Sequence, residues 1–503
     1  MSLRKPWRFL RSAAMADNRP IWWITALAGG ALAALALPPM GAPPLLWLAL
    51  LVLWSLGPRL ALAWGATAVI VSHRWLLWLH PLDWVGVPLP LSLPLCVLLL
   101  AGCGLLGGLL VAAWRWFVQR LGAERLGTAL LASALWGLAE VLLARGPLFW
   151  IGLGAVALPG DRPLAGVARL VGAGGLAALQ LLLAWGLWRL LVLARQRQLR
   201  RLPWRLALLW LGLVVGLHGL GWQQLQLAQR EEMASSLRSL LVLQPAIPTR
   251  RKFSADQQQL LLQRLSRAQE QAGRLGSAAL LLPEGALALG QPLPQPAAVP
   301  VLSGGFRLEG EQLRSALLAF PAGAVDPDAA LDKHRLVPLG EWIPGAEVFR
   351  WAGLSAVGGI TPGGASRLLR LPDGPIAVAI CYELADGRGL AAASGAGAQW
   401  LLASANLDPY PALLQQQFAA LAQLRAIEAG RWLVSSANTG PSLVVDAAGV
   451  IRELAPSGRA ATLAVRLQSR REITAYARCG DLALLLLAAA GILISVRSRV
   501  RES

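Results

Sequence analysis

The stretch Pro375-Ile-Ala-Val-Ala-Ile-Cys-Tyr-Glu383 decides the fold of the central part of this 503-residue chain. Its apolar, β-branched residues predict a buried strand over 376–380, and Cys381 follows that strand directly. A thiol delivered by a buried strand into a sharp turn is a candidate nucleophile if other groups activate it. A single cysteine in a strand is more often inert core, so a catalytic reading of Cys381 depends on partners elsewhere in the sequence.

Two other segments supply such partners. Glu284 ends the apolar run Leu280-Leu-Leu-Pro-Glu284, where burying a carboxylate is costly unless it has a partner or a task. Lys333 lies just after another predicted strand end, and only three of the 46 basic residues are lysines: Lys5, Lys252 and Lys333. In so arginine-rich a chain, a lysine inside a motif indicates that a compact amine is required there.

The order Glu, Lys, Cys, with each residue at the end of a predicted strand, resembles the nitrilase superfamily. The matching pieces are Pro283-Glu284, the Lys333 segment with Gly340-Glu341 behind it, and Cys381-Tyr-Glu383. The resemblance implies a catalytic triad and an αββα sandwich domain. It also implies supporting positions near the triad, namely Glu341, Tyr382 and Glu383.

The region from about 238 to 470 alternates strand-like and helix-like segments, which by itself predicts an α/β domain with one sizeable core. Strands are predicted at 237–243, 278–282, 299–303, 368–371, 376–380, 400–404, 432–436, 443–446 and 461–467. Helices are predicted at 254–274, with Ser254 as N-cap, and at 388–396 and 411–429. Asp373-Gly374 and Ala447-Ala-Gly449 are typical of hairpin turns.

The remainder of the chain predicts a polytopic membrane protein of about eight spans. Hydrophobic residues make up 56% of the chain and charged residues 15%, which is unlike an ordinary soluble domain. Apolar stretches near the length needed to cross a bilayer recur through residues 1–222, and one more follows the α/β region. They are 21–38, 43–57, 60–78, 91–114, 127–144, 170–193, 205–222 and 480–496.

The placement of basic residues predicts the orientation of these spans. With a cytoplasmic N-terminus, the inner segments hold 17 arginines and lysines, whereas the outer loops among the first seven spans hold only Arg74, Arg145, Arg162 and Arg169. This asymmetry is typical of positive-inside insertion, and it puts the α/β region outside and both termini inside. Membrane-flanking arginine also accounts for much of the net charge of +19, so no nucleic-acid partner is expected.

An outward-facing nitrilase-like domain between a seventh and an eighth span resembles the bacterial apolipoprotein N-acyltransferase family over essentially the whole chain. Trp136-Gly-Leu-Ala-Glu140, Gly146-Pro-Leu-Phe-Trp150 and Arg425-Ala-Ile-Glu428 also resemble segments of that family. The expected organisation is a membrane domain at 1–222, a catalytic domain at 223–475 and a last span with a basic tail at 476–503, in the bacterial inner membrane with the catalytic domain periplasmic. The role of Glu140, a carboxylate inside a predicted span, is left open between lining a cavity and pairing with an arginine.

The resemblance implies a reaction and roles for the residues. Members take an acyl chain from a membrane phospholipid onto the cysteine and pass it to the α-amine of an N-terminal diacylglyceryl-cysteine. Glu284 is the expected general base, Lys333 and a backbone N–H after Cys381 the expected oxyanion donors. Phe253 stands where many members have a tryptophan, and Phe253 and Trp342 are the expected substrate-binding residues. The loop Ser404-Ala-Asn-Leu-Asp-Pro-Tyr410 departs from the family pattern, which bears on substrate preference more than on catalysis.

Two other classes of function remain open from the sequence. A membrane-anchored amidase or carbon-nitrogen hydrolase would use the same triad with water as acceptor, but seven spans are more than an anchor requires. A transporter or scaffold would be expected to lack a triad member. The four histidines are too scattered for a metal cluster, so no metal or cofactor is expected, and the four cysteines do not suggest a disulfide framework.

Overall fold

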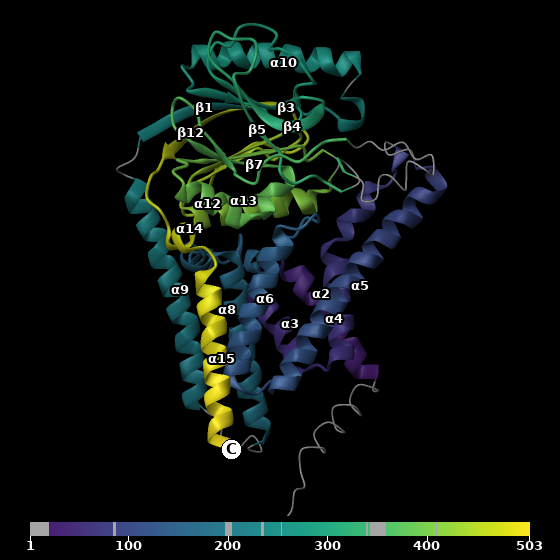
Figure 1. The fold of residues 1–503 in the computed structure, drawn as a ribbon, viewed down its shortest axis with the longest axis vertical. Coiled ribbons are helices and arrows are strands. Elements are labelled where there is room, and N and C mark those ends of the chain that lie inside the picture. The colour runs from purple at the N-terminus through teal and green to yellow at the C-terminus, as the bar shows by residue number, and fades with distance from the viewer. Residues whose placement is uncertain are drawn as a thin grey trace, which may run out of the picture.

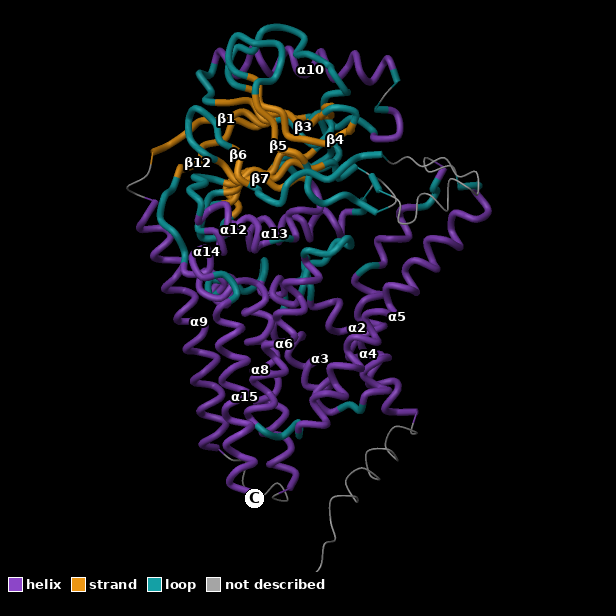
Figure 2. Tube along the Cα trace, viewed as in Figure 1, coloured by secondary structure: helices purple, strands orange, loops and turns teal. Residues whose placement is uncertain are grey.

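The computed structural model describes residues 20–83, 87–196, 204–232, 236–252, 254–338, 341–342, 359–408 and 410–502. A β-rich domain sits on one end of a bundle of apolar helices, and the C-terminus lies at the opposite end of that bundle (Figure 1). Figure 2 separates the two parts by secondary structure, with all strands in the upper part.

Each of the eight apolar segments expected from the sequence overlaps one α-helix, although the segment 60–78 also takes in the separate turn η1 (Arg74–Leu79). The helices are α2 (Pro20–Ala36), α3 (Pro43–Ser55), α4 (Pro58–Ser72), α5 (Leu89–Leu121), α6 (Leu126–Ala144), α8 (Ala168–Gln196), α9 (Trp204–Glu232) and α15 (Leu482–Glu502). Within the described ranges, α5, α6, α8 and α9 are long and apolar enough to cross a membrane, and the other four are shorter apolar helices. Helix α9 ends at Glu232, so it continues past residue 222 into the region expected to be catalytic domain.

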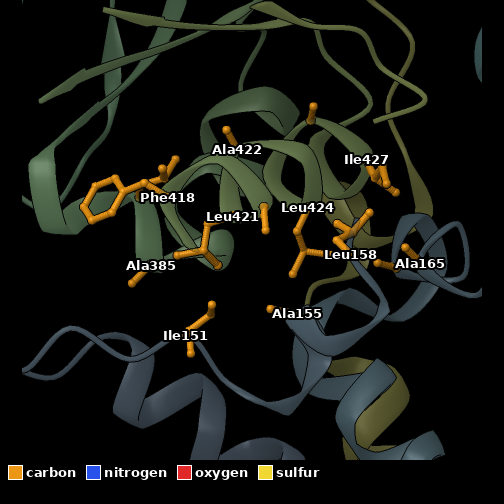
Figure 3. Close-up of a cluster of buried hydrophobic side chains, with 14 of the residues drawn as sticks. Ile151, Ala155, Leu158, Ala165, Ala385, Phe418, Leu421, Ala422, Leu424 and Ile427 are labelled. Atoms are coloured by element: carbon orange, nitrogen blue, oxygen red, sulfur yellow. The ribbon is translucent and has the colours of Figure 1, made fainter. Parts of the chain in front are cut away.

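Short helical turns connect the bundle on the side of the β-rich domain. They are η1 (Arg74–Leu79), η3 (Leu153–Ala157) and α7 (Arg162–Ala165). Apolar side chains from this layer pack against α13 (Ala412–Ala429) of the upper domain, as Ile151, Ala155 and Leu158 facing Leu421 and Leu424 illustrate (Figure 3). The two parts therefore share one continuous hydrophobic contact.

The upper domain contains two six-stranded sheets, which confirms the expected α/β class with two sheets. The first sheet has the order β12-β1-β2-β3-β4-β5, in which β1 pairs in parallel with β2 and β2 with β3, and the other neighbours are antiparallel. Its strands are β1 (Ser236–Gln244), β2 (Ala279–Leu281), β3 (Val301–Glu309), β4 (Gln312–Phe320), β5 (Ala329–Asp332) and β12 (Ala461–Ser469).

The second sheet has the order β11-β10-β9-β8-β7-β6, with parallel pairing of β7, β8 and β9. Its strands are β6 (Leu368–Leu369), β7 (Ile376–Ile380), β8 (Leu401–Ala405), β9 (Leu433–Ala437), β10 (Leu443–Val445) and β11 (Ile451–Leu454). Strands β7, β8 and β9 are buried along their whole length, as expected of parallel strands covered on both faces.

Helices cover the outer face of each sheet (Figure 1). Helix α10 (Ala255–Arg274) packs on β1 and β2, whereas α12 (Gly387–Gly395) and α13 pack on β7 and β9 and separate the second sheet from the apolar bundle. The short α14 (Ala475–Cys479) then leads into α15. The order of layers is helix, sheet, sheet, helix.

Two strands and one helix cap differ from the expectation. Strands β4 and β11 were not predicted, and β5 was expected only as the strand end before Lys333, without bounds. Strand β3 runs on to Glu309 because it forms a long hairpin with β4. The apolar part of β4, Ala316-Leu-Leu-Ala-Phe320, is short and mostly alanine and leucine, which suits a helix as well as a strand. Ser254 does precede α10, but its hydroxyl donates to the carbonyl of Arg251 at 2.6 Å and does not cap the helix.

Candidate active site

The three residues of the expected triad lie at the carboxyl ends of three strands. Glu284 follows β2 after a two-residue Leu-Pro link, Lys333 follows β5 directly, and Cys381 follows β7 directly. Strands β2 and β5 belong to the first sheet and β7 to the second. The packing of the two sheets therefore brings together groups that are up to about a hundred residues apart in the sequence.

The backbone at Cys381 bends sharply where the strand ends. Its φ is +54°, a left-handed conformation that residues with a side chain rarely adopt, and the helical turn η5 (Cys381–Ala385) begins there. Only 4% of the residue is exposed. Such local backbone strain is tolerated where the surroundings fix it, and it tends to occur at functional sites.

Lys333 is held between two carboxylates. Its Nζ donates to Oε1 of Glu284 at 2.6 Å and to Glu341 at 2.8 Å, and its side chain is fully buried. The second oxygen of Glu284 accepts the backbone N–H of Asn406 at 3.0 Å, and Glu341 also accepts the backbone N–H of Val337 at 2.9 Å. Glu341 thus contacts Lys333 directly.

The protonation of this centre follows from its burial and its pairing. Burial, followed by the charge of Glu284, raises the pKa of the Cys381 thiol well above its ordinary value, although Lys333 opposes this. The thiol also hydrogen-bonds Glu284. Burial disfavours the ammonium of Lys333, but Glu284 and Glu341 outweigh it and hold the pKa of Lys333 well above its usual range. The resting centre is a neutral thiol beside a charged lysine.

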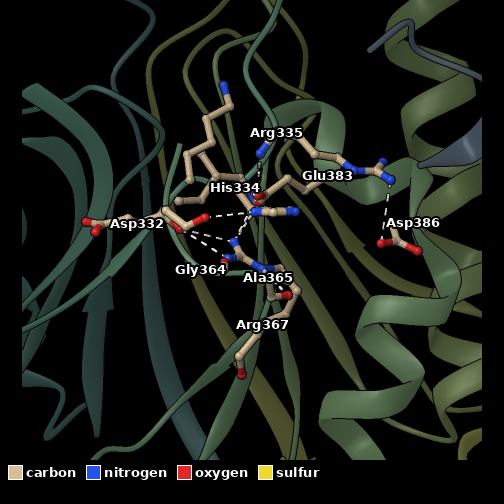
Figure 4. A network of polar contacts seen from close by, with 12 residues as sticks. Asp332, His334, Arg335, Gly364, Ala365, Arg367, Glu383 and Asp386 are labelled. Carbon is tan, nitrogen blue, oxygen red and sulfur yellow. Dashed lines mark hydrogen bonds and ion pairs between the residues drawn. The ribbon is translucent and has the colours of Figure 1, made fainter. Parts of the chain in front are cut away.

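Glu383 anchors the segment that carries Lys333 (Figure 4). Its carboxylate pairs with Arg367 at 2.9 Å, with both side chains almost completely buried. It also accepts the backbone N–H groups of His334 at 2.7 Å and Ile380 at 2.8 Å. Glu383 therefore ties the end of β7, before Cys381, to the loop after Lys333.

Two residues of this site were not identified from the sequence. Arg367 lies directly before β6, in a segment without regular secondary structure, and no sequence motif surrounds it. Asn406 belongs to a loop that was noted only for its departure from the family pattern. Asn406 connects Glu284 to Thr249, whose hydroxyl donates to the Asn406 side chain at 3.2 Å. The one feature of the sequence that could have indicated Asn406 as a site residue is its position directly after the buried strand β8.

Aromatic side chains form a wall beside Cys381 on the side of the apolar bundle. The ring of Tyr382 lies 5.3 Å from that of Phe149 and 6.4 Å from that of Trp75, and its hydroxyl donates to that of Tyr410 at 3.1 Å. Phe149 stacks on Phe418 of α13 with ring centroids 4.9 Å apart. Side chains from the bundle loops and from the catalytic domain thus meet next to the nucleophile.

An apolar cavity of about 360 Å³ lies below this wall, between α2, α4, α5 and α6. His73 and Trp150 line its upper end, and His73 contacts the carbonyl of Phe149 at 3.2 Å, so the cavity adjoins the aromatic wall. Glu140 also lines it. The Glu140 carboxylate accepts the indole N–H of Trp136 at 2.9 Å and the backbone N–H of Leu153 at 2.9 Å.

The structure describes only one of the two residues expected to bind substrate. Phe253 lies outside the described residues. Trp342 is described, is 44% exposed, and pairs through a backbone bridge with Pro338. Trp342 directly follows Glu341, which contacts Lys333. Its side chain is accessible to a substrate that approaches the triad.

Comparison with known proteins gives consistent matches. The carbon-nitrogen hydrolase family model matches residues 322–476. Apolipoprotein N-acyltransferase of Prochlorococcus marinus (strain MIT 9313) is 48% identical over 505 residues, covering 97% of this chain and 98% of that protein. The protein of the same name from Parasynechococcus marenigrum (strain WH8102) is 49% identical, covering 92% and 98%. Among solved structures, Nit3 of Saccharomyces cerevisiae, a nitrilase superfamily member, matches 46% of this chain and 90% of its own with a TM-score of 0.35 and 16% identity.

Proposed function

Because the chain belongs to the apolipoprotein N-acyltransferase family, it is an acyltransferase that N-acylates apolipoproteins, and we propose that the acyl group passes through a thioester on Cys381. The donor is a membrane phospholipid, and the acceptor is the α-amine of an N-terminal diacylglyceryl-cysteine. The observation that carries this mechanism is the contact between Lys333 and Glu284 beside the Cys381 thiol.

In the first half-reaction Glu284 removes the thiol proton as the sulfur attacks the ester carbonyl of the phospholipid. Base assistance is required because the raised pKa of Cys381 keeps the thiol protonated at neutral pH. Lys333 and the backbone N–H of Tyr382 stabilise the negative charge on the tetrahedral oxygen. The carbon–oxygen bond then breaks, Glu284 returns the proton to the leaving lysophospholipid, and the acyl group remains on sulfur.

In the second half-reaction the neutral α-amine attacks the thioester carbonyl. Glu284 takes a proton from the nitrogen as the new amide forms, and the carbon–sulfur bond breaks. The sulfur leaves as thiolate, and Glu284 returns the proton to it, so the resting thiol is regenerated. The net reaction transfers one acyl chain from a glycerol oxygen to a nitrogen and consumes no water.

The surroundings of the triad suit substrates that carry lipid tails. The aromatic wall of Tyr382, Trp75 and Phe149 connects the nucleophile to the apolar cavity among α2, α4, α5 and α6. We assign the acyl chain of the donor to this cavity, whose size falls in the usual range for small-molecule sites. Trp342 is assigned to contact the lipid substrates, and Phe253 keeps the same assignment from its place in the sequence alone.

We also propose that the eight apolar helices cross the bacterial inner membrane, with the catalytic domain periplasmic and both termini cytoplasmic. Exposed leucines on α9, such as Leu208 and Leu209, support contact with lipid. The distribution of arginine supports the orientation. We propose a membrane domain at 1–222, a catalytic domain at 223–475 and a last span with a basic tail at 476–503, although α9 runs on to Glu232.

The decisive experiment incubates the detergent-purified full chain with phospholipid and no acceptor, followed by peptide mass spectrometry. We expect an acyl adduct on Cys381 that hydroxylamine removes and that an apolipoprotein-derived diacylglyceryl peptide discharges as an amide. The C381A variant is the matched control and should carry no adduct. Release of free fatty acid at the same rate with and without the peptide would instead indicate hydrolysis of the thioester, the amidase-type alternative.

A further inference from the structure

Lys252 is a second lysine beside the triad, and the mechanism above does not use it. Its Nζ lies against Gly285, the residue after Glu284. A Cβ added to Gly285 would lie 2.7 Å from this Nζ and 3.7 Å from the ring of Phe306. Gly285 also has a φ of +58°, which favours glycine, and a side chain there would displace the ammonium of Lys252.

The segment before Lys252 is fixed on the catalytic side. The turn η4 (Thr249–Arg251) is tied down by Thr249, whose N–H donates to Asp408 at 2.7 Å and whose hydroxyl donates to Asn406 at 3.2 Å. Asn406 in turn donates its own N–H to Glu284 at 3.0 Å. Lys252 is therefore positioned by the same residues that position the general base.

The same turn is also fixed to the apolar half of the molecule. Arg250 donates to the carbonyl of Pro81 at 3.0 Å and lies 3.8 Å from Asp83, both in the connection between η1 and α5. The turn that carries Lys252 therefore lies where the catalytic domain meets a loop of the bundle.

The charge of Lys252 is not neutralised by an acceptor among the described residues: no hydrogen bond or ion pair to its Nζ is present there, whereas Lys333 has two carboxylates. Glu284 is already engaged by Lys333 and by Asn406. Burial lowers the pKa of Lys252 to about 8, with Glu284 opposing the shift. A partly buried ammonium of this kind gains stability when an anion replaces its lost hydration.

We propose that Lys252 binds the phosphate of the acyl donor and holds the phospholipid with its ester at Cys381. This assignment rests on the proposed function, because it concerns the donor of that reaction. The donor carries its anionic phosphodiester a few bonds from the ester that is attacked, within reach of a cation next to Glu284. The acceptor offers an amine at its reacting end, which an ammonium does not attract. Lys252 therefore acts on the first half-reaction.

The test measures the rate at which Cys381 of the full chain in detergent becomes acylated by two donors. One donor is phosphatidylglycerol, and the other is p-nitrophenyl palmitate, which has no phosphate. For K252M we expect the concentration of phosphatidylglycerol that gives half the maximal rate to rise about tenfold to a hundredfold, the range for losing a hydrogen bond to a charged group. The maximal rate, and acylation by p-nitrophenyl palmitate, stay within twofold of wild type. K252R keeps a cation and restores most of the loss.

Other outcomes separate this inference from the proposed function. If K252M slows acylation by both donors equally, Lys252 acts in the chemical step or maintains the structure of the site, and the phosphate assignment is wrong. An unchanged K252M would show that Lys252 does not contact the donor. If the wild-type chain forms no adduct on Cys381 with either donor, the proposed thioester itself fails, and the phosphate assignment fails with it.

Discussion

The ammonium of Lys333 lies 2.6 Å from Oε1 of Glu284, so the carboxylate that we propose as the general base is shared with a buried cation. This pairing fixes the direction in which Glu284 points, and it leaves the opposite oxygen bound to the N–H of Asn406. The thiol of Cys381 faces the same carboxylate, which raises the pKa of the thiol after the larger effect of burial. The two residues have opposite effects on the sulfur, because Lys333 lowers that pKa.

We predict that E284Q changes acyl transfer and thiol alkylation in opposite directions. Transfer should fall about a hundredfold or more, the lower limit for losing a general base. Alkylation of Cys381 by iodoacetamide should become faster at pH 7 to 8, because removing the Glu284 charge lowers the thiol pKa while Lys333 remains. In wild type the raised pKa keeps the thiol protonated at neutral pH, so the alkylation rate should rise with pH and not level off near the ordinary thiol pKa.

The measurement is the pH dependence of the alkylation rate, read by mass spectrometry on the Cys381 peptide. E311Q is a matched control, because Glu311 is exposed at the turn between β3 and β4. If E284Q shifts the alkylation profile to higher pH, Glu284 is not the group that holds the thiol protonated.

Loss of the Glu383 carboxylate should destabilise the catalytic domain. In E383A the guanidinium of Arg367 stays buried without its counter-charge, which typically costs about 3–5 kcal/mol. The N–H groups of His334 and Ile380 lose an acceptor as well. We expect a lower thermal transition and faster hydrogen exchange at residues 333–338. D256N, in the exposed ion pair with Arg251, should change neither quantity.

The cost of losing Glu383 is attributed to the buried, unpaired charge of Arg367, and a second variant tests this cause. Replacing both partners, as in R367M/E383L, removes the unpaired charge and should recover part of the lost stability. Equal instability of the single and double variants would mean that the backbone hydrogen bonds of Glu383, rather than its pairing with Arg367, hold the Lys333 loop.

The hydroxyl of Tyr382 should matter less than its ring. Burial, and then Tyr410, hold the pKa of Tyr382 well above its usual range, so the hydroxyl does not ionise during turnover at neutral pH. Y382F loses one hydrogen bond to Tyr410, and we expect about a two- to tenfold loss of transfer. Y382A also loses the contacts with Phe149 and Trp75 and should be much slower. A Y382F variant as slow as Y382A would assign a chemical role to the hydroxyl.

The sequence predicted those features that depend on local pattern. Apolar runs located all eight bundle helices and the buried strands β7, β8 and β9, because long or fully apolar segments have few alternatives. Glu284 and Cys381 could be selected because each is an unusual residue at the end of such a run, and Lys333 because lysine is rare in this chain. The family assignment from these residues is confirmed by the close relatives, whereas the catalytic roles remain predictions.

Features that depend on distant contacts could not be predicted. Arg367 matters only because Glu383, on another segment, is buried against it. Strand β4 has polar residues at its start and alanine and leucine at its end, and only the pairing with β3 and β5 makes it a strand. The kink of α8 likewise has no local signal, since Gly172 lies in a glycine-rich apolar helix where any of several glycines could have bent the chain.

The kink of α8 at Gly172 joins the bundle to the catalytic domain. Gly172 has a φ of +68°, and the break in the helix leaves the N–H of Ala173 free to donate to Glu428 of α13 at 2.5 Å. A Cβ on Gly172 would lie 2.3 Å from the ring of Tyr476, which rises from α14. G172A therefore strains the backbone and displaces that ring.

We expect G172A to weaken the joint between the two halves by about 1–3 kcal/mol, the usual range for a strained backbone position. Hydrogen exchange should increase in α13 and α14, and the thermal transition should fall, while Cys381 acylation persists at low temperature. G212A is the matched control, because a Cβ at Gly212 of α9 would have no heavy atom within 4 Å. Equal behaviour of G172A and G212A would mean that the contact between Ala173 and Glu428 does not hold the catalytic domain on the bundle.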